Sequence, residues 1–535
     1  MARVTIETDP TLSRRAFLAT TGGALASAAA FGLVGQAEAS QRQPQRGGTL
    51  RFATREDAAG LDPHRNTMYL VSIPLAATTM GLMDINVKSE PVPGIATEWD
   101  IAPDLLTYTF KLRQGVLFHN GREVDAEAVK WNFERIQDPK IGHPFTRSAL
   151  GNLKETQVLD KYTLRCVLQE PSAAFLADVV YYPCNLMAPD SAEQATMHPI
   201  GCGPFKFVKW ERHSITELAR FENYFETDAE GNSLPYLDGI IGRPKKEDQV
   251  RLTSLRAGEV DLIDNMSYTD AADFPKKYAG KLQTWEVPTL ATSYLKFNVQ
   301  QGPFTDKHLR LAAVHAIDHE AIKQAVFYGR GEVAKGAYAS ASPWFAADAK
   351  AWPEYDPEKA KSILQKAKAV GTEIILQALS SYPYLQQTAE LVQQMWSEVG
   401  FKVALNLYEQ PVLLQKQRDR DFHAESTSGS YRWDPDGWFS RTILSTAPAN
   451  KVSGAGFKNE KADTLIAEAR RTTDKQKRLE LYAAVESIVN EELPILYIHH
   501  LTALQAGAMN LKGYQPAISG PFSTRGGGIR TAWLA

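Results

Sequence analysis

Residues 374–407 read IILQALSSYPYLQQTAELVQQMWSEVGFKVALNL, and this stretch decides the fold class. The runs at 374–379 and 401–407 predict two strands. Between them, apolar residues recur at helical spacing over 385–399, and Gly400 supplies a helix stop. The residues expected to face inward are Leu391, Val392, Met395, Trp396 and Val399. A strand, a helix and a strand in this order form a βαβ unit, which predicts parallel strands and binding at their carboxyl ends.

The chain upstream of this unit carries further helix and strand signals. Asp356 followed by Pro357 predicts a helix start, because Asp caps a helix and Pro fits its first position. Much earlier, residues 105–112 alternate between apolar and polar and predict a half-buried strand, antiparallel to the strand around Cys166. Asp125 is expected to cap the helix that follows. The strand at 105–112, the strand around Cys166 and the helix after Asp125 predict a small α+β lobe ahead of the βαβ lobe.

Residues 430–438 read SYRWDPDGW and bring aromatic, cationic and acidic groups together in one short segment. The Asp434-Pro435-Asp436-Gly437 frame predicts a turn. Aromatic rings give contact area at low entropic cost, while Arg and Asp can orient a ligand. The segment is therefore a candidate recognition loop, and the alternative is a surface turn whose rings pack inward.

The N-terminus reads as an export signal. The twin-arginine sequence SRRAFL at 13–18 precedes an uncharged apolar run that ends at Val34, and AEA at 37–39 forms a small-residue cleavage box. Residues 1–39 are thus expected to be a twin-arginine signal peptide with Ser40 as the first mature residue. No Cys follows the apolar run, so a lipid anchor is not expected. The interpretation is a periplasmic protein that is not lipid-anchored.

Composition narrows the possible partners. The 535 residues are 44% hydrophobic and 23% charged, with a formal net charge of −3. No Lys/Arg block with interleaved aromatics is present, so nucleic acid is not an expected partner. A chain of this length exceeds what one hydrophobic core usually serves, so at least two lobes are expected. We expect a monomer.

The three cysteines invite two interpretations. Cys166 lies on the apolar face of its predicted strand and is expected to be a buried small residue. Cys184 and Cys202 both lie in predicted loops, and an oxidising compartment permits a bridge between them. The sequence therefore predicts a Cys184–Cys202 disulfide.

The sequence does not indicate a metal site or an enzyme active site. His308, His315 and His319 lie at helical spacing, yet a helix face with a capping Asp318 explains them without a metal. The adjacent His499 and His500 would face opposite sides of a strand. No nucleophile elbow, zinc motif or phosphate-binding loop occurs. No cofactor and no metal are expected, and a periplasmic hydrolase remains only a remote alternative.

A series of short motifs, in order along the mature chain, resembles one protein family. The motifs are GGTL at 47–50, LDPH at 61–64, FKLRQGVLFH at 110–119, GCGPF at 201–205, LPYLD at 234–238, LRAGEVD at 255–261, KFN at 296–298, the stretch 309–318, YDPEKA at 355–360 and DPD at 434–436. Together they resemble the family 5 extracellular solute-binding proteins that serve ABC importers for peptides, nickel chelates, opines and some oligosaccharides.

The resemblance implies an α/β fold of the periplasmic binding protein type II kind, with two hinged lobes and an inserted third domain. It implies domain I from residues 47–84, 199–291 and 501–535, the inserted domain II from 85–198, and domain III from 292–500. By the same resemblance, ligand captured between domains I and III closes the lobes, and the closed form docks on permease subunits in the inner membrane.

The resemblance also suggests the ligand site. We expect Tyr431, Arg432, Trp433 and Asp434 to contact the ligand from domain III, with Asn298 at the crossover. Asn66 and Tyr69 are expected to contribute from domain I. Peptide-binding relatives place an acidic residue just upstream of Asp-Pro-Asp to hold the peptide amine, and this chain has none there. The predicted ligand is an oligopeptide or amino-acid-derived compound; an oligosaccharide, stacked on Trp433, Trp438 and Trp344, or a nickel chelate is the alternative.

Overall fold

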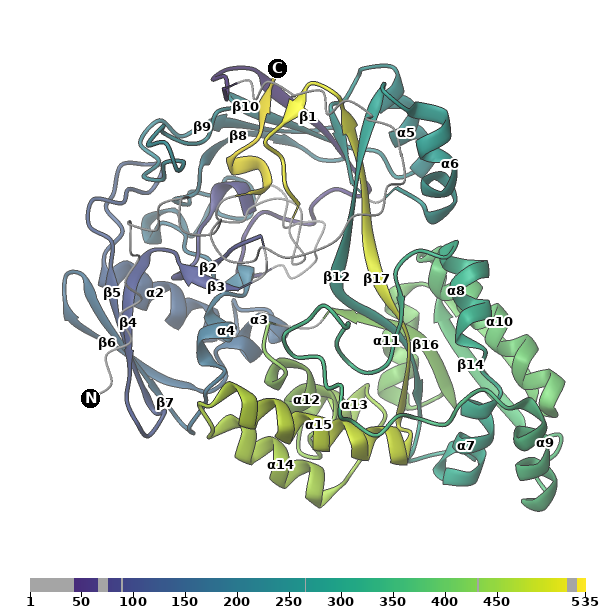
Figure 1. The fold of residues 1–535 in the computed structure, drawn as a ribbon. Helices are drawn as coiled ribbons and strands as arrows, with labels where there is room; N and C mark the ends of the chain where they lie inside the picture. Colours follow the sequence, from purple (N-terminus) through teal and green to yellow (C-terminus); the bar gives the residue numbers. More distant parts are fainter. Residues whose placement is uncertain (1–42, 66–75, 88–89, 265, 431–432, 517–526) are drawn as a thin grey trace, which may run out of the picture. The chain divides into compact units, whose positions relative to one another are not determined.

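The computed structural model describes residues 43–65, 76–87, 90–264, 266–430, 433–516 and 527–535 (Figure 1). Residues Gln45–Ala535 form one compact unit. The predicted export signal, residues 1–39, lies outside the described part of the chain. None of the helices in the described part is long and apolar enough to span a lipid bilayer.

The largest sheet has eleven strands and contains two long antiparallel strands, β12 and β17, that connect its two ends. Its path runs β15-β14-β16-β12-β17-β11-β1-β10-β9-β8, with β13 paired to β17. The strands are β1 (Thr49–Thr54), β8 (Phe205–Glu211), β9 (Ile215–Arg220), β10 (Gly239–Pro244), β11 (Leu262–Ile263), β12 (Leu282–Phe297), β13 (Glu332–Val333), β14 (Glu373–Leu379), β15 (Lys402–Tyr408), β16 (Ala424–Ser430) and β17 (Ile495–Ala508). The first half of β12 pairs only with β17, whereas its second half also pairs with β16.

The predicted βαβ unit is confirmed. Strands β14 and β15 are parallel and in register, and helix α10 (Pro383–Val399) connects them. Gly400 ends this helix with a φ of 116°, in the left-handed region that glycine adopts without steric cost. Strand β16 also pairs with β14 in parallel, so β14 lies between β15 and β16. Trp396 of α10 is buried, and its indole nitrogen donates to Ala313 O at 2.9 Å.

A separate four-stranded antiparallel sheet confirms the predicted α+β region. Its order is β4 (Ala96–Ile101), β5 (Thr107–Leu112), β7 (Thr163–Leu168) and β6 (Leu153–Asp160). Strand β5 pairs antiparallel with β7, which contains Cys166. Helix α2 (Ala126–Gln137) packs on this sheet, and the side chain of its N-cap Asp125 accepts from Ala128 N at 2.9 Å. Alternating burial along β5 and β7 supplies the core between sheet and helix.

Of the remaining helices, α3 contacts α2 and α4 follows β7, whereas the others connect strands of the large sheet (Figure 1). They are α3 (Pro144–Ala149), α4 (Phe175–Val179), α5 (Asp248–Arg256), α6 (Tyr268–Tyr278), α7 (Lys307–His315), α8 (His319–Phe327), α9 (Pro357–Lys366), α11 (Gln410–Asp419), α12 (Asp436–Thr442), α13 (Pro448–Val452), α14 (Glu460–Arg470) and α15 (Lys475–Glu492). The predicted caps Asp318 and Asp356 are confirmed, each accepting a backbone N–H of its helix at 2.9 Å. Helix α12 begins at Asp436, inside the segment that was expected to be a continuous loop.

The C-terminal end of the chain is fixed to distant segments. Short strands β18 (Leu511–Lys512) and β19 (Trp533–Leu534) pair with each other, and β2 (Met83–Ile85) pairs with β3 (Pro91–Pro93). The buried Arg530 guanidinium lies 2.6 Å from a carboxylate oxygen of Asp84, in β2, and 3.2 Å from one of Glu226. One cation near the end of the chain therefore serves two buried carboxylates that come hundreds of residues earlier.

Candidate functional site

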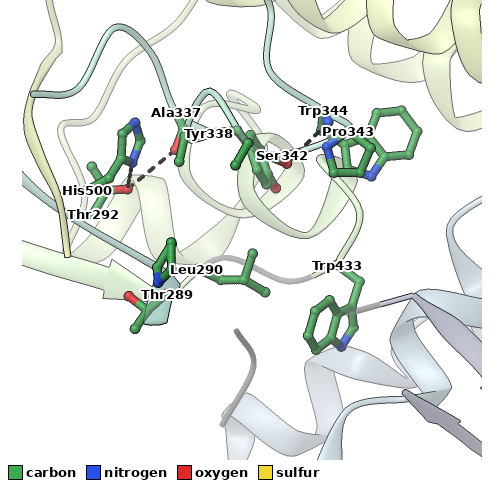
Figure 2. Close-up of a pocket in the computed structure, with 13 residues that line it drawn as sticks. Thr289, Leu290, Thr292, Ala337, Tyr338, Ser342, Pro343, Trp344, Trp433 and His500 are labelled. Atoms are coloured by element: carbon green, nitrogen blue, oxygen red, sulfur yellow. Dashed lines mark hydrogen bonds between the residues drawn. The ribbon is translucent and has the colours of Figure 1, made fainter. Parts of the chain in front are cut away.

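A pocket lies beside the two long strands, where the second half of β12 begins (Figure 2). It has about 590 Å³ of empty volume, open solvent included. It is lined by Pro288, Thr289, Leu290, Thr292, Ala337, Tyr338, Ala339, Ala341, Ser342, Pro343, Trp344, Trp433 and His500. These residues come from β12, β17, the segment after β13 and the residue that follows β16 by three positions. Pockets of this kind, largely apolar with a few polar groups, are typical small-ligand sites.

A bulge in β12 forms one wall. Pro288 pairs with Thr502 and Thr292 pairs with His500, so three residues of β12 oppose the single Leu501 of β17. The Thr289 hydroxyl donates to Leu501 O at 2.7 Å and replaces a lost ladder hydrogen bond. Extra residues in one strand re-aim side chains, and here the bulge brings Thr289 and Leu290 to the pocket.

The opposite end of the bulge is fixed by a buried polar contact. The Thr292 hydroxyl lies 2.7 Å from His500 Nδ1 and 3.5 Å from Ala337 O (Figure 2). Burial lowers the pKa of His500 to about 4. The imidazole is therefore uncharged at neutral pH. The Thr292 hydroxyl of β12 lies between His500 of β17 and the segment that carries Ala337.

Glu486 of helix α15 holds that segment from behind. Its Oε1 accepts from Ala337 N at 3.0 Å, and its side chain is 3% exposed. Burial raises the pKa of this carboxyl to about 8. Gly336 lies beside it, and a Cβ at that position would lie 1.7 Å from Glu486 Oε1, so a larger residue there would displace the carboxyl.

An ion pair underlies the aromatic side of the pocket. The two carboxylate oxygens of Asp434 each lie 2.6 Å from a nitrogen of the Arg478 guanidinium, and both side chains are buried. The guanidinium also lies over the Trp344 ring, 5.2 Å from its centroid. The Tyr338 hydroxyl donates to Asp434 O at 3.3 Å.

The structure brings only some of the predicted site residues to this pocket. Trp433 lines it, and its neighbour Asp434 is engaged by Arg478. Asn298 lies elsewhere and is fully buried: its Nδ2 donates to Phe422 O at 3.1 Å and its Oδ1 accepts two backbone N–H groups. The remaining candidates, Tyr431, Arg432, Asn66 and Tyr69, fall outside the described residues.

The predicted disulfide is corrected by the structure. Cys166, Cys184 and Cys202 are all present as buried thiols. The Cys184 sulfur lies 3.8 Å from Asp178 O, and Cys202 is fully enclosed in the core around the four-stranded sheet. Burial raises the pKa of the Cys202 thiol to about 12. Both side chains act as small core residues instead of a cross-link.

Two other groups of residues singled out in the sequence have structural places. The Trp438 indole is buried and donates to Tyr497 OH at 2.9 Å, so it does not line the pocket. His308 is exposed, whereas His315 is buried and bonds Glu354 O. Within the described ranges, no group of three or more His, Cys, Asp or Glu side chains is placed to hold a metal ion.

Several pocket residues carried no signal that sequence reasoning used. Thr289, Leu290 and Thr292 reach the site through a bulge, and Tyr338 and Ser342 lie in a segment with little regular structure. The one available hint is Pro288 in the middle of a strand, since proline interrupts ladder hydrogen bonding.

Comparison with known proteins assigns the chain to a protein family. The model of the bacterial extracellular solute-binding proteins, family 5 Middle, matches residues 90–451. The chain is 29% identical to the dipeptide-binding protein of Escherichia coli K12, over 80% of this chain and 84% of that protein. It is equally similar, at 29%, to di/tripeptide-binding protein 1 of Pseudomonas aeruginosa UCBPP-PA14, over 85% and 89% of the two chains.

Solved structures agree on the fold. The structure of the binding protein AgaA from A. tumefaciens R10, in complex with agropinic acid, superposes with a TM-score of 0.79 at 26% identity, covering 91% of this chain and 99% of that one. The predicted fold class is thereby confirmed, and so is the prediction of a binding protein instead of an enzyme. The chain belongs to family 5 of the bacterial extracellular solute-binding proteins, the substrate-binding components of ABC importers for peptides and related small ligands.

Proposed function

We propose that this protein captures a short peptide or a peptide-like compound in the pocket beside β12 and β17 and delivers it to the permease of an ABC importer. The observation that carries the proposal is the position of the pocket. It is lined from both long strands at the bulge, where the two ends of the large sheet meet. A ligand bound there contacts the strands about which the lobes would rotate, so its contacts can favour one closure state over another.

The ligand class rests on relatives. The two curated proteins reported above are named for dipeptides and for di- and tripeptides, and each matches along most of its length. The chain lacks an acidic residue directly before Asp434. We therefore expect the peptide amine, if the ligand has one, to be held by another group, and peptide-like compounds without a free amine to bind as well.

The proposal extends to location and organisation. We propose that the protein is exported by the twin-arginine route and cleaved before Ser40. The mature protein is then a periplasmic monomer without a lipid anchor. We also propose three domains: domain I from residues 47–84, 199–291 and 501–535, domain II from 85–198 and domain III from 292–500. The twin-arginine pair at 14–15 and the family's extracellular character support the first of these statements.

Calorimetric titration of the mature protein with di- and tripeptides tests the proposed function. The protein is first unfolded and refolded to remove any bound compound, which native mass spectrometry identifies. We expect micromolar or tighter binding of at least one peptide, weakened more than about tenfold by Trp433→Ala because a large aromatic contact is lost. Trp99→Ala is the matched control, since Trp99 is also half-buried but lies on β4, away from the pocket. Equal affinities of the two variants would remove Trp433 from the site.

A further inference from the structure

The described lining of the pocket carries no charged side chain at neutral pH. Its described lining contains hydroxyl, aromatic and aliphatic side chains and no Asp, Glu, Lys or Arg. Its one titratable imidazole, His500, is uncharged at neutral pH because burial lowers its pKa to about 4. None of the described lining residues supplies a counter-ion, so a charged ligand group placed beside them would lose hydration that they do not replace, which is strongly unfavourable. An uncharged group avoids that penalty.

Three aromatic residues of the pocket lie next to a member of the buried Asp434–Arg478 ion pair. Trp433 is the chain neighbour of Asp434. The Tyr338 hydroxyl donates to the backbone oxygen of Asp434 at 3.3 Å. The Trp344 ring lies under the Arg478 guanidinium at 5.2 Å. Because Asp434 and Arg478 are joined by two short hydrogen bonds, a displacement of either residue moves the aromatic groups together.

Each tryptophan also has a second support. The ammonium group of Lys475 lies 5.6 Å from the centroid of the Trp344 ring, beside the contribution of Arg478. Trp433 packs against the hydrophobic cluster built on the four-stranded sheet. Figure 2 shows both indoles at the end of the pocket away from Thr292 and His500. Rings fixed in this way form a preorganised contact surface, which reduces the entropy lost on binding.

We propose that this end of the pocket receives an uncharged planar group of the ligand, which in a peptide is an aromatic side chain. We further assign the Asp434–Arg478 pair a positioning role: it sets the rings of Trp344, Trp433 and Tyr338 without touching the ligand. This inference rests on the proposed function, because it names the ligand group that the same pocket selects. The result is selection by side chain, with Phe and Tyr preferred over Lys and Glu.

Titration with the dipeptides Ala-Phe, Ala-Tyr, Ala-Ala, Ala-Lys and Ala-Glu tests the selection. We expect Ala-Phe and Ala-Tyr to bind at least about tenfold more tightly than Ala-Lys and Ala-Glu. Trp344→Ala should reduce this ratio to within about threefold. Binding of Ala-Lys or Ala-Glu as tightly as Ala-Phe would overturn the inference.

The positioning role needs a readout that general stability does not move, namely the ratio of Ala-Phe to Ala-Ala affinity. Arg478→Lys keeps a cation opposite Asp434 but loses the bidentate fork and the planar face over Trp344. We expect it to lower the ratio by about fivefold, while the exposed Arg471→Lys leaves the ratio unchanged. An unchanged ratio in folded Arg478→Lys would refute the positioning role.

A blocked amino acid separates the two levels of the proposal. N-acetyl-phenylalaninamide has the planar side chain but neither peptide terminus, and N-acetyl-lysinamide has the same blocked ends with a cation. If no dipeptide binds but the phenylalanine amide still does, detected by ligand-observed NMR and abolished by Trp344→Ala, the peptide assignment fails and the subsite stands. If dipeptides bind and the blocked lysine amide competes as well as the phenylalanine amide, the peptide assignment stands and the subsite fails.

Discussion

Replacement of Glu486 by Gln should change how the stability of the protein depends on pH. The carboxyl is buried behind the pocket segment and has a pKa of about 8, against an ordinary value of 4.5. Between these two pH values the folded protein holds a proton that the unfolded chain has released. The stabilising contribution is therefore fully present below pH 4.5 and is lost as the pH rises through 8.

The size of the effect follows from the same two values. Each pH unit in that interval changes the free energy of unfolding by about 1.4 kcal/mol, so the contribution of Glu486 falls by about 4 kcal/mol between pH 5 and pH 8. The amide introduced by Glu486→Gln does not titrate, and its oxygen can still accept from Ala337 N. The variant should thus lose stability less steeply with rising pH than the parent.

Urea unfolding at pH 5, 6, 7 and 8, followed by tryptophan fluorescence, measures the difference. Glu480→Gln is the matched control, because Glu480 lies on the same helix with an exposed side chain. We expect the control to follow the parent and Glu486→Gln to diverge from both toward alkaline pH. Parallel pH profiles for the parent and Glu486→Gln would refute the assignment of a buried, protonated carboxyl.

Two further predictions concern packing. Gly336→Ala should destabilise the fold by about 1–3 kcal/mol, because the added Cβ would meet the Glu486 carboxyl at 1.7 Å; the same urea assay measures this, and full stability of the variant would contradict the close approach. Cys166, Cys184 and Cys202 should resist alkylation in the native protein and all react after unfolding without reductant, because all three are buried thiols. Mass spectrometry counts the modified thiols, and a single alkylated cysteine in the unfolded chain would restore the disulfide.

Local signals in the sequence predicted much of the fold. The caps Asp125, Asp318 and Asp356 each act on the backbone N–H group three residues away, so the sequence contains the whole interaction. The βαβ unit is similarly compact, since its periodicity and its Gly400 stop lie within a few dozen residues. The start of helix α12 at Asp436 was missed, because Asp-Pro-Asp-Gly is also a good turn sequence.

The site depended on long-range pairings that periodicity does not encode. Asp434 looked available to a ligand because its partner Arg478 comes 44 residues later. Asn298 looked like a polar group at a crossover, yet its amide binds backbone groups near residue 422. The bulge at 289–291 arises from the register between β12 and β17, which only the folded sheet defines. Whether a polar residue is available to a ligand thus depends on which distant segment packs against it.

The salt bridges of Arg530 constrain when, during synthesis, this part of the protein can fold. Strand β1 pairs with β10, which is synthesised some two hundred residues after it, and the cation shared by Asp84 and Glu226 is synthesised 304 residues after Glu226. A nascent chain that stops short of Arg530 would contain two acidic groups in its interior without the cation they share, a strongly destabilising arrangement. This part of the protein therefore cannot complete its folding until Arg530 has been synthesised, and termination before that residue should yield a product that proteases remove.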